Sequence, residues 1–370
     1  MRIETFQLER SQTLWENEVE INLTESGVHP LSLRELLAPD ELDRLLTLPL
    51  GYGYTDGRPE LRDAIAGWYP GARREHVLVT TGSSEANFLL VWSLLEPGDE
   101  LVFMLPNFMQ IWGVARAFGI SVKPFYLRED AGWAPDLDDV QRLVTPRTRM
   151  IAVCNPNNPT GAVLGEPVLA DLAAIAREAG AYLLVDEVYR GSELAGPETS
   201  TVFGRYEKAV VVSGVSKALA HGGLRIGWVV GAPNLVAEVM RRQDYTTIGT
   251  GVLNQQVALR VMQPATRERL LARSRGILSE NLGLLREWVA EYPDRFRFVP
   301  PRAGGMVFLR YDLPISSTEL SGRLRQDESV FVVAGDWFGM DHHLRLGIGG
   351  EPAQLREGLR RMGRFLARVA

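Results

Sequence analysis

The sequence predicts an α/β fold, with a large domain on a mainly parallel sheet and a smaller α+β domain after it. Between about residues 75 and 230, short apolar runs alternate with helical stretches, which is typical of a parallel sheet covered by helices. From about residue 254 to 291 the pattern is helical, and the tail then contains short strand-like runs and a closing amphipathic helix. We therefore expect an N-terminal arm over residues 1–45, a large domain over 46–262 and a small domain over 263–370.

Composition and charge exclude several classes of protein. The 370 residues are 45% hydrophobic and carry a net charge of −6, as in an ordinary globular protein. Because no basic stripe is present, nucleic acid is not expected as a partner. No apolar run approaches the ~18 residues of a membrane span, and the first residues show no secretory signal. The single cysteine, Cys154, excludes an internal disulfide and is typical of a reducing compartment, so we expect a cytoplasmic location.

A glycine-rich stretch at residues 51–57 precedes a helix that begins at Pro59. Its spacing, G-x-G-x-x-x-G, is one residue too long for a dinucleotide fingerprint and no suitable strand precedes it, so we reject a Rossmann fold. Tyr52 lies in this stretch, from which its hydroxyl could project beyond the subunit. Residues 1–50 show poor periodicity, apart from a short helix for which Ser32 is a possible cap.

The next segment reads as strand, tight turn and helix, with Gly82, Ser83 and Ser84 in the turn. Backbone N–H groups and hydroxyls converge at such a helix start, where the helix dipole favours an anion, and a phosphate is the natural ligand. A helix cap without a ligand is the alternative. Phe108 comes just after the following strand, where it could stack on a planar ring or simply pack in the core.

Two further strands end in polar residues. The first runs into Asn155-Pro156-Asn157-Asn158-Pro159-Thr160-Gly161, and the two prolines predict a rigid loop that holds Asn158, with a cis bond at Asn158–Pro159. The second strand, Tyr182 to Val185, ends in Asp186, and Tyr189 follows three residues later. A carboxylate at the end of an apolar strand is costly unless a cation meets it, so Asp186 either has such a partner or lies at the surface.

Lys217 is the central candidate. The chain has only three lysines, and Lys217 lies in a loop of small residues between two apolar strands, eight residues before Arg225. We expect these uncharged neighbours to lower the pKa of Lys217, as a Schiff-base lysine requires. A loop lysine pointing into water is the alternative. In the tail, Arg345 alternates with apolar residues and is either a fixed cation or a solvent-facing arginine on an edge strand.

These motifs together resemble the class I/II aminotransferases, which are fold-type I enzymes that bind pyridoxal 5′-phosphate. The resemblance rests on TGSSEA, NPNNPTG, DEVY, SGVSKALAHGGLRIG and the late Arg345, in the expected order over about residues 45–350. It implies an α/β large domain, a small domain built from both chain ends, and a homodimer with shared active sites. Residues 1–45 would then belong in part to the small domain.

The resemblance also implies roles for individual residues. Lys217 would form the Schiff base and move protons at the substrate Cα, Asp186 would pair with the pyridine nitrogen, and Tyr189 and Asn158 would contact the phenolic oxygen. Arg345, Asn158 and Gly27 would bind the substrate. The remaining cofactor contacts would be Phe108 on the ring, Gly82, Ser83, Ser84, Ser216 and Arg225 on the phosphate, and Tyr52 on the phosphate of the neighbouring subunit. No metal is implied.

Two departures from the family pattern leave questions open. Gly214 stands where relatives commonly have a Ser or Thr that contacts the phosphate, so one donor is lost or Ser213 replaces it. His221 stands where relatives usually have an apolar residue, and we expect a solvated loop histidine rather than a second acid or base. His29 is expected to be a surface or capping histidine rather than a substrate contact.

Three functions are compatible with these residues. The first is an aminotransferase acting on an L-amino acid and a 2-oxo acid. The second is a lyase or cyclase on the same cofactor, since residues 26–29 weakly resemble the capreomycidine-synthase type of arginine-derived cyclase. The third is a non-catalytic ligand-sensing or scaffold module, against which the retention of Lys217, Asp186, Arg225 and Arg345 argues.

Overall fold

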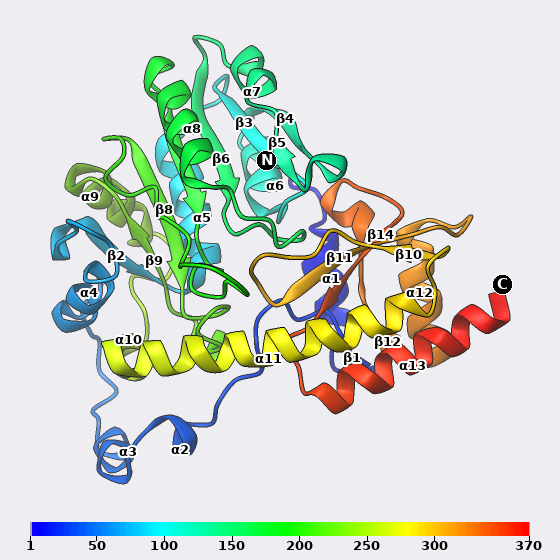
Figure 1. Ribbon diagram of the computed structural model, residues 1–370. Coiled ribbons are helices and arrows are strands. Elements are labelled where there is room, and N and C mark those ends of the chain that lie inside the picture. The colour runs from blue at the N-terminus through cyan, green and yellow to red at the C-terminus, as the bar shows by residue number, and fades with distance from the viewer. Residues whose placement is uncertain (1, 370) are drawn as a thin grey trace.

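The computed structural model describes residues 2–369 and is built around an eight-stranded sheet (Figure 1). The strand order is β2-β9-β8-β7-β6-β3-β4-β5. Neighbours from β8 to β4 run parallel, whereas β9 is antiparallel to both β2 and β8, and β5 is antiparallel to β4. The mainly parallel sheet is therefore confirmed. The strands are β2 (Val77–Thr80), β3 (Glu100–Leu105), β4 (Ser121–Arg128), β5 (Ala134–Pro135), β6 (Thr148–Cys154), β7 (Tyr182–Asp186), β8 (Ala209–Gly214) and β9 (Gly227–Val230).

Apolar residues on the inner strands divide between the two faces of this sheet, because successive side chains of a strand point in opposite directions. Alternate residues of β8 show this, since Val211 packs with the helices α4, α8 and α10, and Val210 and Val212 pack with α5, α6 and α9. Helices thus cover both faces. They are α4 (Pro59–Ala66), α5 (Gly82–Leu94), α6 (Gln110–Ala117), α7 (Leu137–Leu143), α8 (Glu166–Glu178), α9 (Pro233–Gln243) and α10 (Val252–Met262).

A smaller, four-stranded antiparallel sheet has the order β10-β11-β14-β13. Its core is separate from that of the large sheet, and the long helix α11 contacts both α10 and α13 (Figure 1). All strands of the large sheet come from residues 77–230, and those of the small sheet come from residues 296–347. The elements are α11 (Pro264–Ala290), β10 (Phe296–Arg297), β11 (Met306–Tyr311), α12 (Ser317–Glu328), β13 (Val333–Ala334), β14 (His343–Gly347) and α13 (Pro352–Val369).

The N-terminal residues lie beside the C-terminal part of the chain. β1 (Ile21–Asn22) pairs in parallel with β12 (Val330–Phe331), although about 300 residues separate them. The sequence did not predict helix α1 (Gln7–Trp15), which precedes β1 and buries only Leu8 along its length. Its polar composition explains why no periodic apolar face was visible.

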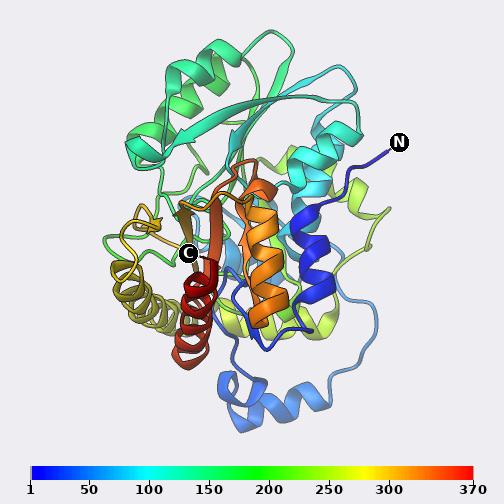
Figure 2. The ribbon, with the colours of Figure 1, turned by 90° about the vertical axis from the view of Figure 1, so that its right-hand side faces the viewer.

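Two short helices, α2 (Leu33–Leu36) and α3 (Pro39–Leu46), project away from the body of the molecule in both views (Figures 1 and 2). The capping box at α2 is confirmed, since the Ser32 side chain accepts a hydrogen bond from the Glu35 N–H and the Glu35 carboxylate binds back to Ser32. Within residues 2–369, no helix combines the length and the apolar character that crossing a bilayer would require.

Candidate active site

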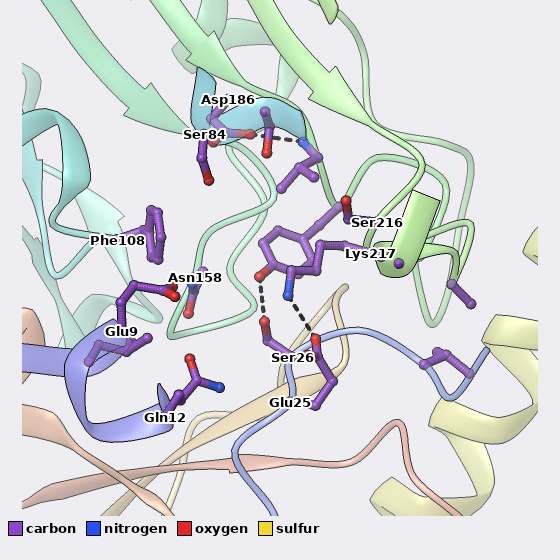
Figure 3. Close-up of a pocket in the computed structure, with 18 of the residues that line it drawn as sticks. Glu9, Gln12, Glu25, Ser26, Ser84, Phe108, Asn158, Asp186, Ser216 and Lys217 are labelled. Carbon is purple, nitrogen blue, oxygen red and sulfur yellow. Dashed lines mark hydrogen bonds and ion pairs between the residues drawn. The ribbon is translucent and has the colours of Figure 1, made fainter. Parts of the chain in front are cut away.

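Most of the predicted site residues converge on one pocket of about 530 Å³ (Figure 3). The pocket lies where the carboxyl ends of the parallel strands face the small sheet. Asp186 ends β7, Lys217 follows β8, and Arg345 comes from β14 of the small sheet. The predicted residues that line it are Ser83, Ser84, Phe108, Asn158, Asp186, Tyr189, Ser216, Lys217, Arg225 and Arg345.

The other three predicted residues lie behind or outside this pocket. A Cβ atom added at Gly27 would lie 3.3 Å from the Lys217 Cα, so the absence of a side chain lets the two segments approach. Gly82 has a φ of +79°, and a Cβ there would collide with the Arg225 guanidinium. Tyr52 is 99% exposed, and its contact with a neighbouring subunit stays a prediction.

Lys217 is paired with a carboxylate that the sequence did not reveal. Its Nζ lies 2.7 Å from Oε1 of Glu25, and the same oxygen accepts the Gly27 N–H at 2.8 Å. Burial alone would lower the pKa of Lys217, but the Glu25 carboxylate outweighs burial, so the pKa is raised. The expected lowering was therefore wrong, because Glu25 is 192 residues away in sequence and only the fold brings it there. Burial would raise the pKa of Glu25, but Lys217 and the Gly27 N–H lower it to about 2.

Asp186 is held at the end of β7 without an ion pair in the described chain. Its carboxylate accepts the Val188 N–H at 3.1 Å and the Asn87 amide at 3.4 Å. Burial raises the pKa of Asp186 to about 6, although these two donors and Lys217 counteract the shift in part. Asp186 is thus a carboxylate in a recess that a cationic ligand would stabilise.

The start of α5 provides an anion site. Ser83 and Ser84 lie in the first turn of this 13-residue helix, and Ser216 and Arg225 face it from the connection between β8 and β9. Arg225 adopts a left-handed backbone conformation with φ of 49°, and its Nη1 donates to the Gly222 carbonyl at 3.0 Å. The guanidinium remains exposed, with other N–H groups free for a ligand. Two hydroxyls, helix N–H groups and one arginine suit a phosphate.

Tyr189 and Asn158 lie between the anion site and the small sheet. The Tyr189 hydroxyl is 2.8 Å from the Ser26 hydroxyl, and burial raises the pKa of Tyr189 to about 12, so it stays a neutral phenol. The Asn158–Pro159 bond is cis, as predicted. Arg345 is 2% exposed and donates to Asn158 Oδ1 at 3.0 Å and to the Thr24 carbonyl. It lies in the small sheet between β11 and β13, so the alternative of a solvent-facing arginine on an edge strand is wrong.

Two open questions around Lys217 are resolved. His221 is buried, its Nδ1 contacts the Leu219 carbonyl, and burial lowers its pKa, so the expectation of a solvated loop histidine was wrong. It is not among the residues that line the pocket. The Ser213 hydroxyl donates to the Glu187 carbonyl at 3.2 Å and is buried, so Ser213 does not replace the donor lost at Gly214.

Several polar residues of the pocket were missed by sequence reasoning, and five of them matter for the argument below. Asn87 lies on α5, one turn after Ser83 and Ser84, and that helical spacing was the available signal. The other four precede the first strand of the large sheet, in a segment without clear periodicity. They are Glu9, Gln12 and Glu16 on or just after α1, and Glu25.

The chain matches the family described as Aminotransferase class I and II over residues 49–362. It belongs to this family. The class I/II aminotransferases are fold-type I enzymes that depend on pyridoxal 5′-phosphate (PLP), so the predicted family, fold class, cofactor and enzyme class are confirmed. The aminotransferase function, with an amino acid and a 2-oxo acid as substrates, is confirmed at the same level.

Three similar curated proteins cover most of the chain. Capreomycidine synthase of Streptomyces vinaceus is 31% identical over 345 residues, which are 91% of this chain and 87% of that protein. The aspartate/prephenate aminotransferase of Thermus thermophilus is 32% identical over 86% of this chain and 84% of its own. The arginine–pyruvate transaminase AruH of Pseudomonas aeruginosa is 30% identical over 87% of this chain and 84% of its own.

Solved structures agree with the fold. A PLP-dependent aminotransferase from Streptococcus suis superposes with a TM-score of 0.94 at 32% identity, covering 100% of this chain and 99% of that one. The PLP-dependent cyclase OrfR superposes with a TM-score of 0.90 at 27% identity, covering 100% and 99%. The solved structures that are similar to this chain therefore include proteins named aminotransferases and a protein named a cyclase.

The residues of the pocket fit PLP. Asp186 has a raised pKa and no cationic partner in the described chain, as expected of a carboxylate that holds the proton of a pyridine nitrogen. Ser83, Ser84 and Arg225 would hold the phosphate, and Phe108 faces the space between them and Asn158 (Figure 3). When bound, PLP supplies an aldehyde carbon that reacts with amines and a ring that accepts electrons from the substrate Cα.

Arg345 gives the first testable prediction. Arg345→Lys and Arg345→Ala are each expected to lower kcat/KM for every amino acid by about 10- to 100-fold, because the charge-assisted hydrogen bonds that the guanidinium is predicted to donate to the substrate α-carboxylate would be lost or weakened. Steady-state kinetics with several donors measures this loss, and the absorbance of bound PLP should not change. Release of PLP with unaltered substrate binding would contradict the role, and Arg345→Lys guards against a folding defect from truncation of a buried side chain.

Proposed function

We propose that this enzyme transfers the amino group of an L-amino acid to a 2-oxo acid with Lys217 as the residue that bonds to PLP and moves protons at the substrate Cα. The observation that carries the proposal is the convergence of Lys217, Asp186 and Arg345 on one pocket. The three elements that position them are far apart in sequence. They place an amine, a ring-directed carboxylate and a buried cation around one space.

Each of these side chains has a distinct task. Asp186 keeps the ring nitrogen protonated, which strengthens the ring as an electron acceptor. Arg345 binds the α-carboxylate and orients the Cα–H bond, and Tyr189 and Asn158 hold the phenolic oxygen by hydrogen bonds. Lys217 would act as the neutral amine: it would take the proton from the substrate Cα and would then give that proton to the neighbouring carbon of the cofactor.

We further propose a homodimer with shared active sites and a cytoplasmic location. Large apolar side chains are exposed between residues 46 and 54, where Leu46 is 80%, Leu50 77% and Tyr52 99% exposed. Such a row is typical of a surface that a second subunit covers. The unpaired, buried Cys154 supports the location.

The test is an absorbance titration of the purified holoenzyme with single amino acids and no acceptor. We expect the bound cofactor to change from its aldehyde form to its amine form, and a 2-oxo acid to reverse the change. Consumption of the amino acid without conversion to the amine form would contradict transamination.

A second candidate is a lyase or cyclase that uses the same pocket. It is supported by the similarity to capreomycidine synthase and to the cyclase OrfR. In the same titration this candidate predicts a product that retains the amino nitrogen of the substrate and has lost a leaving group from its side chain. Mass spectrometry of the reaction mixture distinguishes the two outcomes.

A further inference from the structure

We propose that the substrate is an amino acid with a cationic side chain, an ammonium or a guanidinium, and that the carboxylates of Glu9, Glu16 and Glu25 bind this cation. The inference rests on the proposed function, since it concerns the substrate of the same pocket. It names a class of side chain that neither the family nor the motifs around Lys217 specify.

The carboxylates come from two segments that face one pocket. Glu9, Gln12 and Glu16 recur at the spacing of successive helical turns, so α1 and the residue after it present them on one side. Glu25 comes from the irregular segment after β1. In Figure 3, Glu9 and Gln12 lie on the same side of the pocket as Glu25, opposite Asp186 and Ser84. Gln12 donates to Thr24 Oγ1 at 3.0 Å, which leaves its amide oxygen as a further acceptor.

In the proposed function, no cation that lines the pocket is left to pair with the three glutamates. Its cations are Lys217, Arg225 and Arg345, and in the proposed function these serve the cofactor carbon, the phosphate and the α-carboxylate. In the same proposal, the Asp186 carboxylate pairs with the protonated pyridine nitrogen of PLP. The three glutamates then have no cationic protein partner; Glu9 and Glu25 are exposed and Glu16 is half-buried, so a cation that enters the pocket can reach them. Within residues 2–369, no ion pair or side-chain hydrogen bond involves the carboxylates of Glu9 and Glu16.

Without cofactor or substrate, the Glu25 carboxylate forms an ion pair with the ammonium of Lys217. When Lys217 bonds to the cofactor, its ammonium is no longer available at 2.7 Å from Glu25. The Gly27 N–H still donates to Oε1 of Glu25 at 2.8 Å, so this carboxylate stays in place. A substrate ammonium or guanidinium that enters beside it replaces the lost charge.

An independent observation places the other end of the ligand. Arg345 lines the same pocket at 2% exposure, and its Nε has no hydrogen-bond partner in the described chain. A buried guanidinium nitrogen without a partner indicates an anionic ligand group nearby. The pocket therefore offers a cation for one end of the ligand and a group of carboxylates for the other, which suits an α-amino acid with a positive tail.

The same charges disfavour an acidic donor. A substrate with a second carboxylate would meet Glu9, Glu16 and Glu25 with like charge, and every cation that lines the pocket already has a ligand group. The preference therefore differs from that suggested by the name of the Thermus thermophilus relative, an aspartate/prephenate aminotransferase.

Five amino acids of similar length test the inference. L-arginine and L-lysine carry a cation, L-citrulline replaces the guanidinium with a neutral urea, L-norleucine is apolar and L-glutamate is anionic. We expect kcat/KM for the better of arginine and lysine to exceed that for citrulline and norleucine by about 10- to 100-fold, with glutamate the poorest. The ranking of arginine against lysine distinguishes a guanidinium from an ammonium. Equal or better rates with norleucine or glutamate would overturn the inference.

Paired variants connect the preference to the named side chains. The double variant Glu9→Gln, Glu16→Gln is expected to remove most of the preference for a cation while the rate with norleucine changes less than about threefold. Glu18→Gln is the matched control, because Glu18 is exposed, lies beside the same helix and does not line the pocket. A double variant that keeps the full preference would overturn the assignment of Glu9 and Glu16.

A binding measurement separates this inference from the proposed function. 5-Guanidinopentanoate has the carboxylate and the guanidinium but no amino group, and 5-ureidopentanoate is its neutral counterpart, so neither can react. Calorimetry with the holoenzyme should give a Kd about 10-fold or more lower for the guanidino compound. Equal affinities would overturn the inference, whatever reaction is catalysed. If the preference holds but no amino acid converts the cofactor, the proposed function fails instead.

Discussion

Replacing Lys217 with alanine is expected to lower kcat for transamination by about 10⁴-fold, the largest effect of any single substitution in this pocket. In the proposed function, the Lys217 amine is both the group that bonds to PLP and the group that carries the proton at Cα. No other lysine lines the pocket, so no neighbour can replace it in the described chain. Steady-state and single-turnover kinetics on the purified variant measure the loss.

Lys208→Ala is the matched control for this experiment. Lys208 is half-buried, its Nζ donates to the Gly180 carbonyl at 2.6 Å, and it lies outside the pocket. The control should keep full activity. PLP should still bind to Lys217→Ala through Asp186 and Arg225, but without a covalent bond. A Lys217→Ala protein within tenfold of the parent rate would contradict the role of Lys217.

Replacing Asp186 with asparagine is expected to lower kcat by about 10²- to 10³-fold and, in the same protein, to stabilise the apoenzyme. The loss of activity follows because a neutral amide cannot keep the pyridine nitrogen protonated, so the ring accepts electrons less readily. Kinetics with saturating PLP measures this effect. The gain in stability follows from the environment of the carboxylate.

Burial raises the pKa of Asp186 in the folded apoenzyme to about 6, from an ordinary value of 3.8. The folded state is therefore favoured by protonation, and stability is lost as the pH rises from about 4 through about 6. Two pKa units correspond to about 3 kcal/mol, and partial access to solvent reduces the expected cost to about 2 kcal/mol. Asp186→Asn removes that cost, so its gain in the free energy of unfolding should be largest above pH 7 and shrink toward pH 4.

Urea unfolding of the two apoenzymes at pH 7.5 and at pH 5 measures this gain. Asp171→Asn is a suitable control, since Asp171 is exposed on α8 and lies outside the pocket. A less stable Asp186→Asn apoenzyme at pH 7.5 would mean that the carboxylate is stabilised in the fold and is not waiting for a cationic ligand.

The sequence predicted those parts of the site that depend on short segments. Asp186 ends a run of apolar residues, Ser83 and Ser84 open a helix, and Asn158 lies between prolines, so each motif determines its own local structure. Arg345 was a weaker case, because alternation with leucines does not distinguish an inner strand from an edge strand. Arg345 is buried because its strand, β14, has a neighbour on each side, β11 and β13. The pairing of β13 with β14 could not be predicted from the sequence.

What the sequence could not predict depends on contacts between distant segments. Glu25 reaches Lys217 across 192 positions, and it reverses the expected direction of the pKa shift of the lysine. Helix α1 has few apolar residues, so its helical period was hidden, and Glu9 and Glu16 gave no signal as pocket residues. Short segments were therefore enough to predict the residues proposed to hold the cofactor. The carboxylates proposed to bind the substrate come from the N-terminal segment, which only the fold brings to the pocket.

Borohydride reduction of the holoenzyme, followed by peptide mass spectrometry, tests most directly whether PLP is bound in this pocket. Reduction fixes an amine-linked cofactor on its lysine. The expected result is the mass of the reduced cofactor on the peptide that contains Lys217, and none in protein that is pretreated to remove PLP. Label on Lys123 or Lys208, or no labelled lysine in a protein with stoichiometric PLP, would contradict the assignment of the active site.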